Sequence, residues 1–276
     1  MRILGIVILY YPDEKTKSNI ESYSIYLDKL IVWNNTPQKG ATDLFFSNHE
    51  NIVPMGTEKN EGIGKPLNEA VKYAIQHNYT HLLTMDQDSS FLPEKFQTYL
   101  EVVKQNENSF IGLFSPGNNS PEGEHPYSII EIERIITSGT IYKIHVFREV
   151  GLFRDDYFID AIDAEFSLRV RRTKIQIVRI MDICMQHVLG NKIEKKVGFI
   201  KMQSLNYSPM RTFYIIRNHL ITRLDYPEYK NIAYMMKLFV VKRFFAILFI
   251  ESDKRAKLKA LFRGLFCGLT KNMQSY

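Results

Sequence analysis

Two clusters of carboxylates carry the clearest chemical potential in this sequence. Asp86 and Asp88 directly follow the apolar run His81–Met85, and their i, i+2 spacing on an irregular turn lets both face one site. Hard divalent cations such as Mg²⁺ and Mn²⁺ prefer carboxylate oxygens and keep room for substrate phosphates. The pair therefore indicates a site for a metal and a phosphate, although Asp and Ser are also common in ordinary turns at strand ends.

The second cluster places Asp160, Asp163 and Glu165 within six residues. We expect a helix to begin near Asp163, where the helix dipole stabilises acids. A carboxylate held near a nucleotide can also take a proton from an attacking hydroxyl group. His187 follows a further apolar stretch, 177–185. It is either a metal ligand or, more commonly for a lone histidine, a structural residue.

Three further segments are candidates for binding. Asn60–Lys65 offers glycines for close backbone approach to a phosphate and a cation beside them, but its glycine spacing matches no standard nucleotide loop. Ser138 and Gly139 lie between two predicted strands, where a simple kink is the alternative. Arg217 lies on a predicted helix, where a solvated face is the alternative. Motifs of serine hydrolases and zincins are absent from the sequence.

These residues need a scaffold, and the hydrophobic pattern predicts one. An apolar, β-branched run closed by Pro12 indicates a buried first strand. Apolar residues at helical spacing follow the Asn60–Lys65 segment. Alternating strands and helices predict an α/β sheet with much parallel pairing, which binds ligands at the carboxyl ends of its strands. We expect strands at 3–10, 29–33, 80–85, 129–136, 140–143 and 177–185, and helices at 65–77, from Pro93, at 163–172 and at 209–224.

The composition limits the class of protein. The chain has 276 residues, of which 45% are hydrophobic and 24% charged, as in globular proteins; this excludes disordered and fibrous classes. Two cysteines are too few for a disulfide framework or a cysteine-rich zinc site. The short apolar start predicts no signal peptide, and no apolar run is long enough for a plain transmembrane helix. We therefore expect a reducing, cytoplasmic setting.

Positive charge is concentrated at the end of the chain. Residues 229–276 hold ten Lys or Arg and two acids, a net +8, so the +6 of the whole chain leaves −2 for residues 1–228. This argues against a nucleic-acid-binding body and for a tail that meets an anionic partner. Basic amphipathic helices bind anionic membrane surfaces; packing on the catalytic domain or on a second subunit, as a homodimer, is the alternative. The apolar residues at helical spacing are Leu258, Leu261, Phe262, Leu265 and Leu269, flanked by Lys257, Lys259 and Arg263.

Taken in order, the motifs resemble the family 2 glycosyltransferases of GT-A fold, close to their bacterial rhamnosyltransferase-like branch. The resemblance spans Met1 to Leu224 and is specific through the combination of motifs rather than through any one of them. The matching segments are Tyr10–Pro12, Val32–Thr36, Asn60–Gly62, Leu67–Asn68, Met85–Ser89, Ser138–Thr140, Val150–Phe153, Tyr157–Glu165, Met185–Gly190 and Tyr214–Asn218.

The resemblance implies a Rossmann-like, mixed and mostly parallel sheet flanked by helices. A catalytic domain at 1–228 would be followed by a basic, amphipathic helical extension at 229–276. It also implies an inverting glycosyltransferase that moves a sugar such as rhamnose from a nucleotide-diphospho-sugar, dTDP- or UDP-linked, with Mg²⁺ or Mn²⁺. The acceptor would be a glycan or lipid-linked glycan of bacterial surface polysaccharide synthesis, reached from the inner face of the plasma membrane.

The same resemblance implies a role for each matched residue. Asp163 matches the catalytic base, and Glu165 the acid two residues later. Asp88 and His187 match the metal ligands. Asn34 stands where relatives usually have Asp, which leaves the nucleotide open. The donor positions are Tyr10, Asn34, Asn60, Gly62, Lys65 and Asp86; Ser138 and Gly139 match the floor of the acceptor pocket, and Arg217 matches a residue on the donor-phosphate or acceptor side.

Two other functions are the alternatives. A sugar nucleotidyltransferase would carry a Gly-rich, basic loop after its first strand, and Tyr10–Asp13 is not such a loop. A catalytically inactive binding or scaffold protein would keep the fold without the chemistry. The joint presence of Asp88, Asp163 and His187 argues against it.

Overall fold

The computed structural model describes residues 1–38, 50–117, 128–187, 193–197 and 200–276. The chain forms two compact units. The first comprises Met1–Asp155 and Asp163–Val188, and the second comprises Asp156–Ile162 and Leu189–Tyr276. Each is described by itself.

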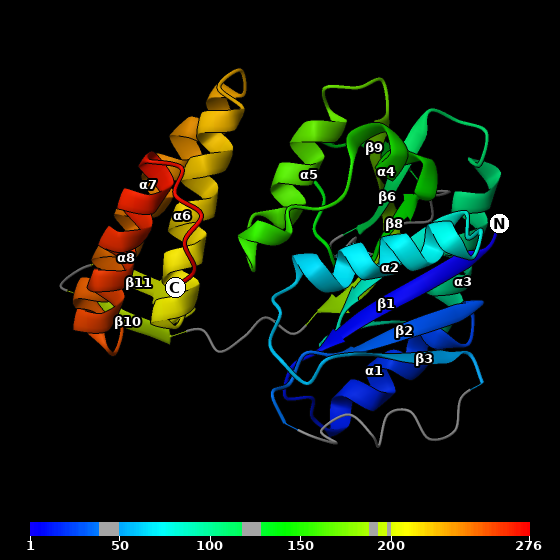
Figure 1. Ribbon diagram of the computed structural model, residues 1–276, viewed down its shortest axis with the longest axis horizontal. Helices are drawn as coiled ribbons and strands as arrows, with labels where there is room; N and C mark the ends of the chain where they lie inside the picture. The colour runs from blue at the N-terminus through cyan, green and yellow to red at the C-terminus, as the bar shows by residue number, and fades with distance from the viewer. Residues whose placement is uncertain (39–49, 118–127, 188–192, 198–199) are drawn as a thin grey trace. The chain divides into compact units, whose positions relative to one another are not determined.

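The first unit is built on one mixed sheet with strand order β3-β2-β1-β4-β8-β6-β9-β5, and β7 pairs with β9 (Figure 1). The strands β3, β2, β1 and β4 are parallel neighbours, while β8 runs antiparallel to β4 and β6. The strands are β1 Ile3–Leu9, β2 Lys29–Asn34, β3 Ile52–Gly56, β4 His81–Asp86, β5 Ser89–Phe91, β6 Ile111–Gly117, β7 Ile129–Glu131, β8 Thr140–Lys143 and β9 Gln176–His187.

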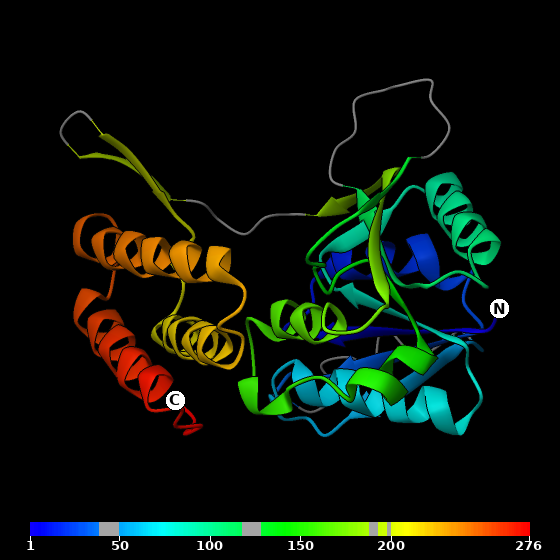
Figure 2. The same cartoon turned by 90° about the horizontal axis from the view of Figure 1, so that it is seen from above.

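Helices cover both faces of this sheet. Figure 2 shows α1 (Glu14–Ser24) and α3 (Pro93–Gln105) on one face, and α2 (Gly64–Gln76) and α4 (Ile144–Val150) on the other. Aromatic residues of α1 and α3, among them Tyr23 and Phe96, are fully buried against the apolar side chains of the strands. Burial on both faces explains why β1 is an almost unbroken apolar run. The predicted α/β class is confirmed.

Most elements predicted for the first unit are present, but β3, β5, β6, α1 and α4 were not predicted, and one predicted strand is shorter than expected. β7 ends at Glu131 instead of continuing to residue 136. β3 was missed because Pro54 argues against a strand. Among the described strands β3 pairs with β2 alone, and a proline is tolerated in such an edge strand. β6 was missed because Gly112, Pro116 and Gly117 interrupt its apolar pattern. A short helix, α5 (Ile162–Val170), begins next to Asp163, as predicted.

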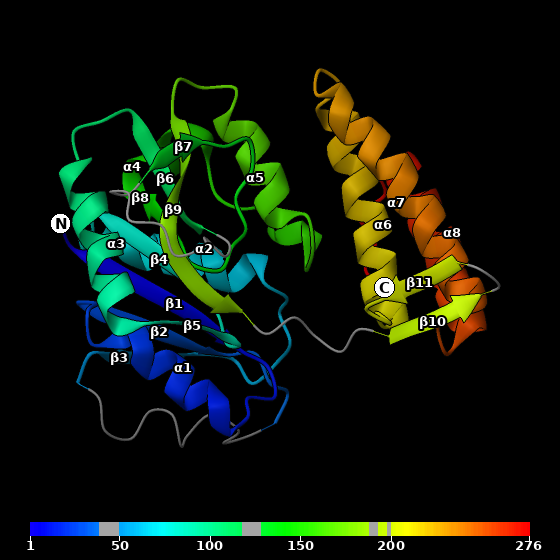
Figure 3. The same cartoon turned by 180° about the vertical axis from the view of Figure 1, so that it is seen from behind.

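The second unit combines a hairpin with three helices. Strands β10 (Ile193–Val197) and β11 (Ile200–Ser204) pair antiparallel, and α6 (Pro209–Asp225), α7 (Lys230–Phe249) and α8 (Lys254–Leu269) lie side by side (Figure 3). α6 begins with a capping serine, Ser208, and a proline in its first turn, which is typical of a helix N-terminus. Ile216 and Leu220 of α6 form a small core with Ile247 of α7 and Leu261 of α8.

No helix among the described residues is both long enough and apolar enough to cross a membrane.

Candidate active site

Three parallel strands bring their carboxyl ends to one edge of the sheet. In the register of the sheet, Ile8 of β1 lies opposite Trp33 of β2 and Asp86 of β4. The residues that follow these strands therefore emerge together, and they include Tyr10, Asn34 and Asp86. Open α/β sheets bind their ligands at this edge.

Gln87 connects two of these strand ends. Its Oε1 accepts a hydrogen bond from the Tyr10 backbone N–H at 2.7 Å, and its Nε2 donates to the Tyr10 carbonyl at 3.0 Å. The ring of Tyr10 is left exposed, so it can serve as a stacking surface. The sequence pattern does not single out Gln87, because a glutamine between two aspartates has no distinctive spacing.

Asn34 and Asn35 bind different segments of the backbone. Asn34 is buried, and its Oδ1 accepts a hydrogen bond from the Thr36 backbone N–H at 2.9 Å, which closes the turn after β2. Asn35 reaches the glycine-containing loop, where its Nδ2 donates to the Gly62 carbonyl at 3.0 Å and its Oδ1 accepts from the Glu61 N–H at 2.8 Å. Sequence reasoning singled out Asn34 and missed Asn35.

The loop before α2 is fixed from within as well. Asn60 Oδ1 accepts hydrogen bonds from the Gly62 N–H at 3.1 Å and from Asn35 Nδ2 at 3.2 Å, and Gly62 has a φ of +75°, which suits glycine. Lys65, in the first turn of α2, pairs with Glu61 at the surface. The hydrogen bond to Glu61 raises the pKa of Lys65, so this side chain is a cation at neutral pH.

Asn68 binds the backbone on the other side of α2. Its Oδ1 accepts from the Phe153 N–H at 2.9 Å and its Nδ2 donates to the Phe153 carbonyl at 3.0 Å. Next to it, a side chain at Gly64 would lie 2.6 Å from the Asp155 Cα. The start of α2 and the 153–155 segment therefore lie in direct contact, and only glycine fits at residue 64.

Ser138 lies beneath the Asp86–Ser89 turn. Its hydroxyl accepts from the Asp86 N–H at 3.1 Å and donates to Ser89 Oγ at 2.8 Å. The side chain is 1% exposed, and Gly139, with a φ of +78°, has no room for a Cβ beside Pro116. In the structure Ser138 holds the acidic turn, whereas the sequence predicted it at the floor of an acceptor pocket; that contact stays a prediction.

The metal prediction is supported by the sheet only in part. β5 runs antiparallel to β9 with Ser89 opposite His187, so the backbone of His187 lies next to the turn that carries Asp88. The His187 side chain and residues 188–192 lie outside the described part of the structure. Among the described side chains, no group of three or more His, Cys, Asp or Glu residues is placed to hold a metal ion. The metal site therefore stays a prediction.

Asp163 lies in the first turn of α5, where its Oδ1 accepts a hydrogen bond from the Ala164 N–H at 2.7 Å. Burial raises the pKa of Tyr142, and the charges of Asp163 and Asp86 add to the rise. Both carboxylates therefore act on one buried tyrosine of β8, which links the two acidic clusters. A hydrogen bond with Thr84 opposes the rise. Nothing in the sequence pattern singles out Tyr142.

Glu165 has a structural partner. It is 2% exposed and pairs with Arg169 one turn later, with Nε and Oε1 2.9 Å apart. Arg169 also donates to the Val150 carbonyl at 2.7 Å. These contacts hold α5 to the end of α4, and a ligand contact of Glu165 stays a prediction.

In the second unit, Arg217 departs from its predicted role. It is fully buried, and its guanidinium donates to Asn218 Oδ1 at 2.9 Å, to the Asp156 carbonyl at 2.8 Å and to the Gln274 carbonyl at 2.7 Å. A side chain engaged in this way is not available to a phosphate or an acceptor. We therefore assign Arg217 to the frame of the second unit, not to the donor.

Arg217 and Asn218 hold a strained segment. Phe158, Asp160 and Ala161 all have φ between +62° and +65°, a region that costs non-glycine residues about 1–2 kcal/mol each. Asn218 Nδ2 donates to the carbonyls of Tyr157 at 2.8 Å, Ile159 at 2.8 Å and Asp160 at 3.0 Å.

A bidentate ion pair adds to this hold, because Arg211 binds both carboxylate oxygens of Asp160 at 3.1 Å. Burial raises the pKa of Asp160, and Arg211 opposes the rise. Backbone strain of this kind is concentrated at functional sites.

Known proteins were compared with the chain. No family model matches it. The dTDP-rhamnosyl transferase RfbF of Shigella flexneri is 27% identical over 240 residues, which cover 78% of this chain and 78% of that protein. The crystal structure of S. aureus TarS 1–349 in complex with UDP-GlcNAc has a TM-score of 0.58 at 14% identity, covering 99% of this chain and 88% of that one. The crystal structure of S. aureus TarS 1–349 gives 0.55 at 13%, with the same coverage.

The similarity to the solved structures concerns the fold, and the similarity to the curated relative concerns the family. Their evidence agrees with the ordered motifs and with the edge formed by β1, β2 and β4, and so confirms the predicted resemblance. The similarity to the curated relative and the shared fold support a bacterial family 2 glycosyltransferase of GT-A fold.

Proposed function

We propose that this enzyme moves a deoxyhexose such as rhamnose from a dTDP- or UDP-linked donor to a hydroxyl group, with inversion at the anomeric carbon. The observation that carries the proposal is the edge of the sheet where Asp86 ends β4 beside the carboxyl ends of β1 and β2. The similarity to a dTDP-rhamnosyl transferase supports the donor class.

The donor would lie across the strand ends. The exposed Tyr10 ring and the turn at Asn34 would meet the base and ribose. The loop at Asn60 and Gly62, with the Lys65 cation, would meet the diphosphate, since helix N-termini and nearby cations bind phosphates. Glu61 would have to release Lys65 for this contact.

Asp163 would act as the general base. An ordinary aspartate is a weak base at neutral pH, but a transition state of oxocarbenium character makes only a late demand on it. The attacking hydroxyl oxygen forms its bond to the anomeric carbon while its proton passes to Asp163, and the nucleoside diphosphate leaves on the opposite face.

The carboxylates of Asp86 and Asp88 fit a hard divalent cation, and His187 follows on the neighbouring strand. Asp88 and His187 would hold Mg²⁺ or Mn²⁺, with Asp86 toward the ribose and the metal's water shell. When bound, the cation would neutralise charge on the leaving diphosphate.

The acceptor class follows from the same resemblance. We place the reaction in the synthesis of a bacterial surface polysaccharide, with a glycan or lipid-linked glycan as acceptor, in the cytoplasm at the inner face of the plasma membrane. Ser138 and Gly139 would form the acceptor floor, and Glu165 would lie beside the base. Residues 1–228 would form the catalytic domain and 229–276 its extension.

A thermal-shift series tests the proposal. The enzyme is heated with dTDP-, UDP- and GDP-sugars, each with and without Mn²⁺, because a ligand that binds only the folded state raises the melting temperature. We expect a metal-dependent rise with dTDP- or UDP-sugars, and turnover with an added acceptor. Metal-dependent binding without turnover, over a range of acceptors, would favour the inactive scaffold instead.

A further inference from the structure

The helix α7 buries a charged side chain and exposes several large apolar ones. Arg243 is 5% exposed, while Phe245, two residues later and so about 200° around the helix, is 44% exposed. A helix on the surface of a globular protein usually buries its apolar face and exposes its charges. Among the described side chains of α7, the exposed large apolar ones are Leu238, Val241, Phe245, Leu248 and Phe249.

The helix α8 shows the same arrangement, with a buried charged side chain and exposed apolar ones. Lys257 is 2% exposed, and Phe266, nine residues later and on the opposite side of the helix, is 65% exposed. Phe262 and Leu269 are exposed beside Phe266. The stripe predicted from the sequence to meet a membrane therefore divides. Leu261 and its neighbours Leu258 and Leu265 pack in the core with α6, whereas Phe262 and Leu269 face outward.

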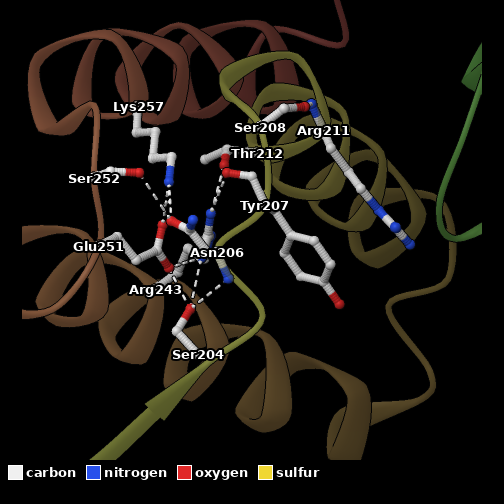
Figure 4. A network of polar contacts seen from close by, with 10 residues as sticks. All are labelled: Ser204, Asn206, Tyr207, Ser208, Arg211, Thr212, Arg243, Glu251, Ser252 and Lys257. Carbon is white, nitrogen blue, oxygen red and sulfur yellow. Dashed lines mark hydrogen bonds and ion pairs between the residues drawn. The ribbon is translucent and has the colours of Figure 1, made fainter. Parts of the chain in front are cut away.

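A buried network of charges holds both helices in this orientation (Figure 4). Glu251, in the turn between them, pairs with Arg243 of α7 and with Lys257 of α8. The Lys257 Nζ lies 3.0 Å from the Glu251 Oε2. Arg243 also donates to Thr212 Oγ1 of α6 at 2.7 Å, and Lys257 to Asn206 Oδ1 at 2.5 Å. Buried charges must stay paired, so neither helix can turn its apolar face inward without separating these groups.

The charge around the exposed apolar residues indicates what covers them. The described side chains of α7 and α8 include no acid. The acids between the helices are Glu251, which is buried, and Asp253. Two copies meeting through this face with two-fold symmetry would bring like charges together. An anionic lipid surface matches both the apolar and the cationic residues. The exposed cations are Lys242, Lys254, Arg255, Lys259 and Arg263.

We propose that the exposed faces of α7 and α8 dock on anionic phospholipids, with Phe262, Phe266 and Phe245 entering the headgroup region and Arg255 and Lys259 binding the headgroups. The role of this docking rests on the proposed function, because a lipid-linked acceptor would require the enzyme to reach a membrane. Vesicle binding is nevertheless measured without donor or acceptor, so the two proposals can fail separately.

Flotation of the full chain with vesicles tests the surface. We compare phosphatidylcholine vesicles with vesicles that also contain phosphatidylglycerol. The unchanged protein should float with the anionic vesicles, and the double variant Phe262→Ser/Phe266→Ser should bind them at least about tenfold more weakly. Arg255→Gln/Lys259→Gln should lose the preference for the anionic vesicles. Phe110→Ser is the matched control, because Phe110 is a 79% exposed aromatic residue of the first unit.

Three results would overturn the proposal: no flotation of the unchanged protein, equal flotation of the Phe262→Ser/Phe266→Ser variant, or equal loss in Phe110→Ser. Sedimentation velocity is measured alongside. A dimer that disappears in the double variant, without vesicle binding, would assign the face to a second copy. A double variant that loses flotation but keeps the donor-induced thermal shift shows that the two phenylalanines serve membrane docking and not donor binding. If the unchanged protein floats but shows no donor-induced shift, the proposed function fails and the docking surface stands.

Discussion

The two acidic segments of this enzyme are held by different means. The Asp86–Ser89 turn follows β4 and is bound by the Ser138 hydroxyl and, through Gln87, by the Tyr10 backbone, and none of its residues has a positive φ. The segment from Phe158 to Ala161 follows no strand and holds three residues at positive φ. Register with a sheet positions the first segment, whereas buried polar side chains of α6 must position the second.

The largest loss of stability is expected for Asn218→Ala. The change removes the amide that satisfies three carbonyls of the strained segment. Unpaired buried groups cost about 1–3 kcal/mol each, so we expect a loss of about 2–4 kcal/mol in the free energy of unfolding, measured in urea. Asn106→Ala is the control, because its Nδ2 meets one carbonyl, that of Val102. An equal loss in both variants would show that the segment does not depend on Asn218.

A pH titration separates the two units. Burial, and next the charge of Lys143, lower the pKa of His81 in the first unit to about 4. Between pH ~6.5 and pH 4, His81 is therefore protonated in the unfolded chain and neutral in the folded chain. The free energy of unfolding falls as the pH falls through this range, by up to about 3 kcal/mol.

His81→Gln should flatten this dependence. Unfolding in urea from pH 7 to pH 4 measures it, and parallel curves for the variant and the unchanged protein would contradict the assignment. Asp160 in the second unit acts in the opposite sense. The pKa of Asp160 is raised in the folded state. Its contribution to the free energy of unfolding is therefore complete below the ordinary pKa of aspartate and is lost as the pH rises through the raised pKa.

Ser138→Ala tests the support of the first segment. It leaves the Asp86 N–H and the Ser89 hydroxyl without this partner. We expect a loss of about 1–2 kcal/mol in stability and weaker donor binding. Ser18→Ala, which removes an exposed hydroxyl bound to the Lys15 carbonyl, is the control. Unchanged donor affinity in Ser138→Ala would show that the turn holds its shape without the hydroxyl.

The smallest effect on stability is expected for Tyr142→Phe. The hydroxyl is buried and has one hydrogen bond, with Thr84, among the causes of its pKa shift, so its removal should lower the free energy of unfolding by about 1 kcal/mol. Because Asp163 and Asp86 both act on this group, turnover should change more than stability does. A loss of stability above about 2 kcal/mol, with turnover unchanged, would show that the hydroxyl serves the fold and not the reaction.

The sequence predicted what depends on strand periodicity. β1, β2 and β4 are short apolar runs closed by polar residues, so the edge that carries Asp86 could be predicted before the fold was known. It did not predict which polar groups satisfy one another across the fold. Ser138 lies 52 residues from the amide that it accepts, and Asn218 lies 58–61 residues from its three acceptors. Contacts at such separations leave no periodic signal.

The second unit shows a different limit. The leucine spacing of α8 correctly predicts a helix, but the same spacing does not tell whether a stripe faces the core or the surroundings. Glu251 decides this by pairing with both Arg243 and Lys257 inside the unit. A prediction that exposes every lysine therefore places Lys257 wrongly.

The central claim is that Asp163 is the base of a glycosyl transfer at this edge of the sheet. Asp163→Asn keeps the size of the side chain and removes its basicity. Donor binding by thermal shift and turnover by release of nucleoside diphosphate are measured on the same sample. We predict an unchanged donor shift and a turnover reduced about 10²–10⁴-fold, the range of general base catalysis. Full turnover in this variant would contradict the account.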